Sequence, residues 1–166
     1  MTDLAYDFHA DREAARITMR RDFAAPRDLV WDCYTRAELL DRWYAPAPLT
    51  TETKTMDFRE GGHWHFAMIT PEGEHYWSRF DFDSITPRDA MTYRDGFSDA
   101  EGRIAPDLPR SEARMTFTED GAGTTVRTVV QYASPEAVDT VIGMGLEAGL
   151  ASTLSKLDEL LADLAR

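Results

Sequence analysis

Three of the four histidines form the most obvious candidate metal site in the sequence. His63 and His65 would share one face of a strand, so two ligands to one ion are plausible. His75 follows a turn signal, and pairing across that hairpin leaves it about 20 Å from His65 at ~3.3 Å per residue. We therefore expect no metal site. The same register places His65 opposite Asp81 and His63 opposite Asp83, which predicts ion pairs on the outer face of the sheet.

Covalent and nucleotide chemistry have weaker signals. Cys33 is the lone cysteine, and no histidine signature lies near it, so a small buried side chain is a better interpretation than a nucleophile. The spacing Gly143-x-Gly145-x-x-x-Gly149 is similar to a loose dinucleotide fingerprint, but it does not follow a strand in a βαβ unit. No phosphate-binding loop or carboxylate pair stands out, so we expect no cofactor. For an enzyme, the weak polar candidates are Arg79, Tyr93, Asp95 and Arg127.

Large apolar side chains are the remaining candidate for function. Aromatic residues recur along several predicted strands, and part of this set is expected to be ordinary core. Small residues gather in the first half of the last helical stretch. A glycine inside a helix costs up to ~1 kcal/mol of stability, so its presence there suggests that the fold needs open space beside the helix. Together these features predict an apolar ligand cavity. Its predicted lining is Trp31, Trp43, Trp64, Phe66, Phe80, Phe82, Tyr93, Phe97, Met115, Phe117, Gly145, Leu146 and Gly149.

The element that must carry one wall of such a cavity is the last one, from about Gly145 to Leu164. Leucines recur there at steps of three and four, which is the spacing of one apolar helix face. Each buried leucine is worth roughly 1.5–3 kcal/mol, so this face needs a partner surface. The stripe consists of Leu146, Leu150, Leu154, Leu157, Leu161 and Leu164.

The chain before this helix reads mainly as strands joined by hairpins. Residues 1–15 have no clean period, and alternation predicts a first strand over residues 17–23. Pro26 and Asp28 then suit the start of a short helix, and a second follows until Pro46 and Pro48. Further strands are expected over residues 51–58, 64–68, 76–83, 90–97, 113–117 and 126–130. This order predicts an α+β fold with an antiparallel sheet wrapped around the C-terminal helix.

Turn signals also predict the register of two hairpins. A turn at residues 72–74 pairs Phe66 with Phe80 and Trp64 with Phe82, and a two-residue turn at Asp120-Gly121 sets Met115 opposite Val126. The connection over residues 98–110 contains two prolines and a glycine. We expect it to be mobile and to lie at the mouth of the cavity.

The length and the net charge of the chain limit the number of domains and the classes of binding partner. A chain of 166 residues fits a single domain over 1–166, with an ordered core from about 16 to 164. The net charge is −12, and only Lys54 and Lys156 among the 18 basic residues are lysines, which argues against nucleic acid and anionic membrane as partners. One cysteine, no signal-peptide core and no long apolar run predict a cytoplasmic protein.

Several motifs fall in an order that resembles the START-like, or SRPBCC, superfamily. They are Phe23-Ala24-Ala25-Pro26, Val30-Trp31, Leu39-Leu40, Trp43-Tyr44-Ala45-Pro46, Asp57-Phe58-Arg59-Glu60-Gly61-Gly62, Trp64-x-Phe66, Gly123-Thr124-Thr125-Val126 and Gly143-Met144-Gly145-Leu146-Glu147-Ala148-Gly149. Within the superfamily, the chain is similar to the subfamily named after the activator of the ninety-kilodalton heat-shock protein ATPase. That family usually has tryptophan and glycine where this chain has Tyr44 and Ala45.

The resemblance implies a helix-grip fold, in which a curved antiparallel sheet with two short helices after the first strand encloses an apolar cavity with the long helix. The first hypothesis is therefore binding of a small hydrophobic molecule. A cofactor-independent enzyme of the polyketide cyclase or hydrolase type, using the same cavity, is the second. A chaperone-interaction module is the third, and a homodimer is possible, as in many relatives.

Overall fold

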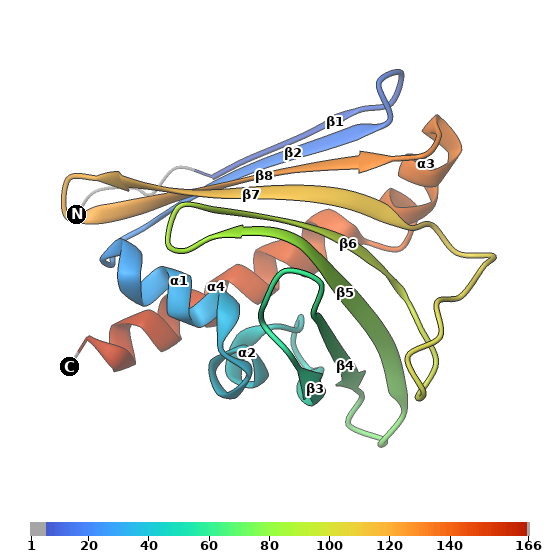
Figure 1. The fold of residues 1–166 in the computed structure, drawn as a ribbon, viewed down its shortest axis with the longest axis horizontal. Helices are drawn as coiled ribbons and strands as arrows, with labels where there is room; N and C mark the ends of the chain where they lie inside the picture. The colour runs from blue at the N-terminus through green and yellow to red at the C-terminus, as the bar shows by residue number, and fades with distance from the viewer. Residues whose placement is uncertain (1–5, 166) are drawn as a thin grey trace.

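The computed structural model describes residues 6–165 as one curved antiparallel sheet and four helices. The sheet order is β1-β2-β8-β7-β6-β5-β4-β3. Figure 1 shows the sheet curving around α4, with α1 and α2 at one end of the enclosed space. The elements are β1 (Tyr6–Asp11), β2 (Arg16–Phe23), α1 (Arg27–Thr35), α2 (Ala37–Trp43), β3 (Thr50–Met56), β4 (His63–Ile69), β5 (His75–Thr86), β6 (Ala90–Phe97), β7 (Ser111–Asp120), β8 (Gly123–Tyr132), α3 (Pro135–Gly143) and α4 (Leu146–Leu164).

Helix α4 buries its second half more deeply than its first. Leu154, Leu157, Leu160 and Leu161 are buried, whereas Leu146, Leu150 and Leu164 are only partly covered. Of these, Leu160 lay outside the predicted stripe. The helix begins after Gly145, whose φ of 85° lies in the left-handed region that glycine tolerates best. The predicted helix is thus confirmed, but its amino-terminal half is the less firmly packed part.

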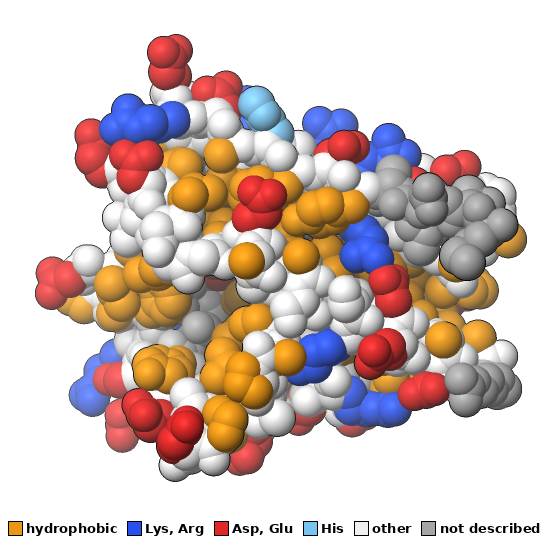
Figure 2. Space-filling model, turned by 180° about the vertical axis from the view of Figure 1, so that it is seen from behind, with side chains coloured by type: hydrophobic (Ala, Val, Ile, Leu, Met, Phe, Trp, Pro, Cys, Tyr) orange, Lys and Arg blue, Asp and Glu red, His pale blue; other side chains and the backbone are white. Residues whose placement is uncertain are grey.

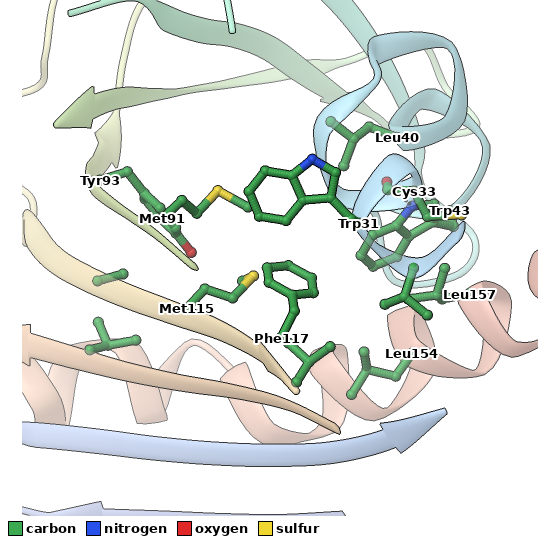
Figure 3. Packing of buried hydrophobic residues seen from close by; sticks show 14 of the residues in the cluster. Trp31, Cys33, Leu40, Trp43, Met91, Tyr93, Met115, Phe117, Leu154 and Leu157 are labelled. Atoms are coloured by element: carbon green, nitrogen blue, oxygen red, sulfur yellow. Dashed lines mark hydrogen bonds between the residues drawn. The ribbon is translucent and has the colours of Figure 1, made fainter. Parts of the chain in front are cut away.

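The two short helices cap one end of the sheet through aromatic contacts. Trp31 of α1 packs edge-on against Phe117 of β7, with ring centroids 5.0 Å apart. Trp43 of α2 is almost fully buried, and its indole N–H donates to the backbone carbonyl of Cys33 over 2.9 Å. Figure 3 shows these side chains meeting Leu154 and Leu157 of α4. The aromatic residues of this end therefore form packed core.

Two elements were not predicted. Residues 6–11, within a stretch that has no clean hydrophobic period, form β1, which pairs with β2 at the edge of the sheet. β1 was missed because its alternation of Tyr6, Phe8 and Ala10 with polar residues is short, and five of its six residues are exposed. The helix α3 precedes α4, and the hydroxyl of Ser134 caps it by accepting the N–H of Ala137 over 3.2 Å.

Both predicted hairpin registers are wrong by two residues. Trp64 pairs with Phe80, and Phe66 pairs with Ser78, because the turn is centred one residue earlier than expected. Phe117, rather than Met115, pairs with Val126, since the turn occupies residues 121–122. An even shift keeps every side chain on its predicted face of the sheet. The predicted assignment of side chains to the inner and outer faces of the sheet is therefore correct despite both register errors.

The connection over residues 98–110 packs on the outer face of the sheet, away from the helices. His65 is 4% exposed, and its Nε2 lies 3.0 Å from the backbone carbonyl of Asp99. Arg79 donates to the carbonyl of Gly102 over 3.2 Å. The prediction that this loop lies at the cavity mouth is wrong, because the loop covers His65 on the outer face. The predicted surface ion pair of His65 with Asp81 is also wrong, because His65 is buried and lies opposite Arg79 in the hairpin.

Candidate functional site

A small cavity lies on the inner face of the sheet, between the strands and the two short helices. Its volume is about 20 Å³. Figure 3 shows Tyr93, Met91 and Met115 approaching one another beside Trp31 and Leu40. Aromatic rings and methionine side chains dominate the wall, which consists of Tyr34, Leu40, Tyr44, Trp64, Phe80, Phe82, Met91, Tyr93 and Met115.

Five of the predicted lining residues lie in this wall, namely Trp64, Phe80, Phe82, Tyr93 and Met115. Trp31, Trp43, Phe66 and Phe117 are buried in the surrounding core instead, and Phe97 and Leu146 are partly buried. Phe66, two residues further along β4, stacks directly on Trp64 with centroids 3.8 Å apart, so it packs beside the wall on the same face of the sheet. Alternation along the strands identified the correct face but not how far along each strand the cavity extends.

The two predicted lining glycines lie elsewhere. Gly145 is exposed and precedes the helix, and a Cβ added to it would meet no atom within 4 Å. A Cβ on Gly149 would lie 3.7 Å from Cγ of Pro46, in the loop after α2. Gly149 thus gives room for the loop after α2, and neither glycine lies in the wall of this cavity, so their contact with a ligand stays a prediction.

Sequence reasoning missed four residues of the wall, namely Tyr34, Leu40, Tyr44 and Met91. Tyr44 is the most central of them: its ring packs edge-on against those of Trp64, Phe66 and Phe80, at centroid distances of 5.0, 5.7 and 6.0 Å. It stands where the resemblance expects tryptophan. That departure was the available signal, because an exchanged aromatic residue in a motif points to a changed cavity.

A row of side chains crosses the inner face beside the cavity. Directly opposite residues on five neighbouring strands, β4 to β8, form it: Trp64, Phe80, Asp95, Ser111 and Tyr132. We call this set the Trp64–Tyr132 row. Trp64 and Ser111 of this row are buried and Phe80, Asp95 and Tyr132 are half-buried, whereas Phe82, Tyr93 and Ala113, in the next row, are all buried. The row therefore marks the level at which the enclosed space starts to open to water.

Asp95 is the acidic group of this row. Its carboxylate accepts the Ser111 hydroxyl. Burial raises the pKa of Asp95 above its ordinary value, while the side-chain and backbone hydrogen bonds of Ser111 and the charge of Arg110 act in the opposite direction. A carboxyl group in such surroundings can accept a hydrogen bond from a ligand or exchange a proton with it.

Phenol groups surround the same space. Burial raises the pKa of Tyr44, and the negative charge of Asp95 adds to that increase. The pKa of Tyr93 is raised in the same way, first by burial and then by neighbouring groups that include Tyr44 and Asp95. Both hydroxyls therefore stay protonated at neutral pH and can each donate one hydrogen bond.

Other chemistry has less support in the described part of the chain. Within residues 6–165, no three His, Cys, Asp or Glu side chains come together as a possible metal site. Cys33 is buried, and burial raises the pKa of its thiol to about 11, which disfavours the reactive thiolate. Figure 3 shows Cys33 within the hydrophobic cluster, in keeping with a structural side chain. None of the helices in residues 6–165 has the length and apolarity needed to span a membrane.

The far end of the enclosed space carries apolar side chains on its surface. Figure 2 shows a hollow in the face seen from behind, with hydrophobic side chains along its rim. Exposed large hydrophobic residues include Ile142, near the end of α3, and Met144, between α3 and α4, at 40% and 53% exposure. These side chains adjoin the less firmly packed start of α4.

Comparison with known proteins agrees with this architecture. Protein Ms6760 from Mycobacterium smegmatis is 30% identical over 96% of this chain and 97% of its own, with a TM-score of 0.86. A protein from Arthrobacter aurescens is 24% identical over 95% of this chain and 91% of its own, with a TM-score of 0.88. CalU16 from Micromonospora echinospora, at 20% identity over 96% of this chain and 87% of its own, shares the fold with a TM-score of 0.61. No curated protein matches.

The sequence family that matches is described as "Activator of Hsp90 ATPase homolog 1-like protein", and its model covers residues 24–162. This span includes both short helices, the strands β3 to β8, and nearly all of α4. The superfamily resemblance and the helix-grip architecture are thus both confirmed. The chain belongs to the family of Activator of Hsp90 ATPase homolog 1-like proteins.

Proposed function

We propose that this protein binds a small, largely apolar molecule on the inner face of the sheet, in the cavity between the strands and the two short helices. The observation that carries the proposal is the cavity wall itself. Its nine residues are three tyrosines, three other aromatic residues, two methionines and a leucine, so none is charged. Aromatic and methionine walls of this kind suit planar or flexible apolar ligands, because they offer a large contact area with few fixed polar demands.

Binding requires the cavity to widen. A volume of about 20 Å³ holds about one water molecule, whereas sites for small organic ligands occupy roughly 300–1,000 Å³. The start of α4 is the part that can move at least cost, since none of residues 146–152 is fully buried. One hydrogen bond joins this part to the loop after α2: the N–H of Ala47 donates to the hydroxyl of Ser152 over 3.0 Å.

Titration with a neutral fluorescent probe, N-phenyl-1-naphthylamine, tests the proposal. Met115 lines the cavity and is buried, so Met115→Ala should cost about 2–5 kcal/mol of stability and should bind the probe more tightly, because part of the required space is already open. Leu160→Ala is the matched control, since Leu160 is buried on α4 and does not line the cavity. It should lose similar stability without gaining affinity.

Native mass spectrometry of freshly purified protein complements the titration, because it detects any ligand that co-purifies. Absence of saturable probe binding in both the wild-type protein and Met115→Ala would refute the proposed function. Equal tightening in Met115→Ala and Leu160→Ala would place the bound probe outside this cavity and would refute the proposed site.

A further inference from the structure

We infer that the site selects neutral aromatic ligands that carry a hydroxyl group, held by Asp95, Tyr44 and Tyr93, and that it rejects the corresponding carboxylates. This inference rests on the proposed function and adds the chemical class of the ligand. It follows from where the polar groups stand in an otherwise apolar wall.

Asp95 is placed to meet a ligand that enters from the open side. It is the β6 member of the Trp64–Tyr132 row, with Phe80 opposite on one neighbouring strand and Ser111 opposite on the other. Phe80 on the neighbouring strand and Tyr93, two residues earlier on β6, both line the cavity, so the carboxyl group stands at the edge of the wall. Asp95 is half-buried, which leaves part of it accessible. A carboxylate has about four acceptor positions, so Ser111 leaves capacity for a ligand donor.

The phenols of the wall can complete the contact. Among residues 6–165, the Tyr44 and Tyr93 hydroxyls have no protein hydrogen-bond partner in this structure, although each belongs to the cavity wall. A ligand hydroxyl can donate to Asp95 while it accepts from one of these phenols. A ligand without a hydroxyl leaves these groups unpaired when it displaces water, which lowers its affinity.

The basic side chains near Asp95 form ion pairs away from the cavity wall. On the outer face of the sheet, Arg79 and Arg110 both pair with Asp81. The charge of Arg110 reaches Asp95 from there and offsets only part of the effect of burial. An anion in the cavity would therefore face the charge of Asp95 without a cation in the wall.

The helix side offers no free cation to the cavity either, within the described part of the chain. Arg21 of β2 pairs with Asp158 of α4. Lys156 of α4 donates to the backbone carbonyls of Ala45 and Leu49 over 2.9 and 3.3 Å. Both basic side chains thus fasten α4 to neighbouring segments, and a carboxylate ligand would have to compete with those contacts.

Calorimetric titration with a matched pair of probes, 2-naphthol and 2-naphthoate, tests the inference at pH 7, where the first is neutral and the second is an anion. Wild-type protein should bind the naphthol at least about tenfold more tightly. Asp95→Asn should weaken the binding of naphthol and strengthen the binding of naphthoate, so that the ratio of the two affinities falls by about tenfold. Tyr44→Phe, which removes only a hydroxyl, should weaken naphthol and leave naphthoate unchanged.

Glu112→Gln is the matched control, because Glu112 is exposed and adjoins Ser111. Its replacement changes the net charge by the same amount as Asp95→Asn. It should leave both affinities unchanged, and melting curves establish that each variant is folded. Equal binding of both probes by wild type and Asp95→Asn would overturn the inference while the proposed function stands. Failure of wild type to bind naphthalene, 2-naphthol or N-phenyl-1-naphthylamine would overturn the proposed function, and this inference with it.

Discussion

Replacing Gly149 by alanine should stabilise the protein. Gly149 lies inside α4, where alanine is favoured over glycine by about 0.8–1.0 kcal/mol. The added Cβ would lie 3.7 and 3.8 Å from the Cγ and Cβ of Pro46, which is ordinary van der Waals contact, so no overpacking opposes the gain. At about 2–4 °C per kcal/mol for a chain of this size, the melting temperature should rise by about 2–4 °C.

The same exchange at Gly145 should have the opposite sign. Gly145 has φ of 85°, and a left-handed conformation costs a residue with a Cβ about 1–2 kcal/mol, although the space around it is open. Thermal melts followed by circular dichroism, with Gly149→Ala and Gly145→Ala measured side by side, check both signs. A fall in melting temperature for Gly149→Ala would refute the placement of this residue against Pro46. A rise for Gly145→Ala would refute the left-handed start of α4.

Three further predictions concern other parts of the molecule. The pKa of Asp95 in the folded protein lies above its ordinary 3.8, so the native state binds more protons than the unfolded state. Asp95 therefore destabilises the folded protein increasingly as pH rises from about 3.8 through the raised pKa. The melting temperature of Asp95→Asn should therefore exceed that of wild type by a margin that grows over this pH window and then levels off; a constant margin would contradict this. His65→Ala should free the loop over residues 98–110, and limited proteolysis should cleave there sooner than in wild type. Trp43→Phe should cost about 1–3 kcal/mol in urea unfolding, because the carbonyl of Cys33 loses its buried donor, whereas an unchanged midpoint would deny that hydrogen bond.

The fold could be predicted from the sequence wherever a periodic pattern was long. The leucine spacing located α4, and alternation located most strands and their inner faces. The hairpin registers were wrong, because glycine and acidic residues around Gly73 and Gly121 allow turns centred at neighbouring positions. β1 was not predicted because its alternation is only six residues long and five of those residues are exposed, as on an edge strand.

The candidate site was predictable only in part. Aromatic residues on the inner face were recognisable, but cavity wall and solid core have the same composition, as Phe80 and Phe117 illustrate. The Trp64–Tyr132 row depends on which residues stand opposite one another over five strands. An error of two residues in one hairpin is enough to hide it. Asp95 was therefore visible as a candidate, while its neighbour Ser111 was not.

The pairing of β2 with β8 has a consequence for how the chain is made. Asp22 and Thr125, which share a hydrogen bond over 2.7 Å, are 103 residues apart in the sequence. At a synthesis rate of about 5–20 residues per second, β2 waits roughly 5–20 s for its partner to leave the ribosome. During that interval the apolar inner faces of β4 to β6 lack α4 as well. Nascent chains that stall before β8 are therefore expected to need chaperones, and mature protein should refold more slowly than helical domains of equal length.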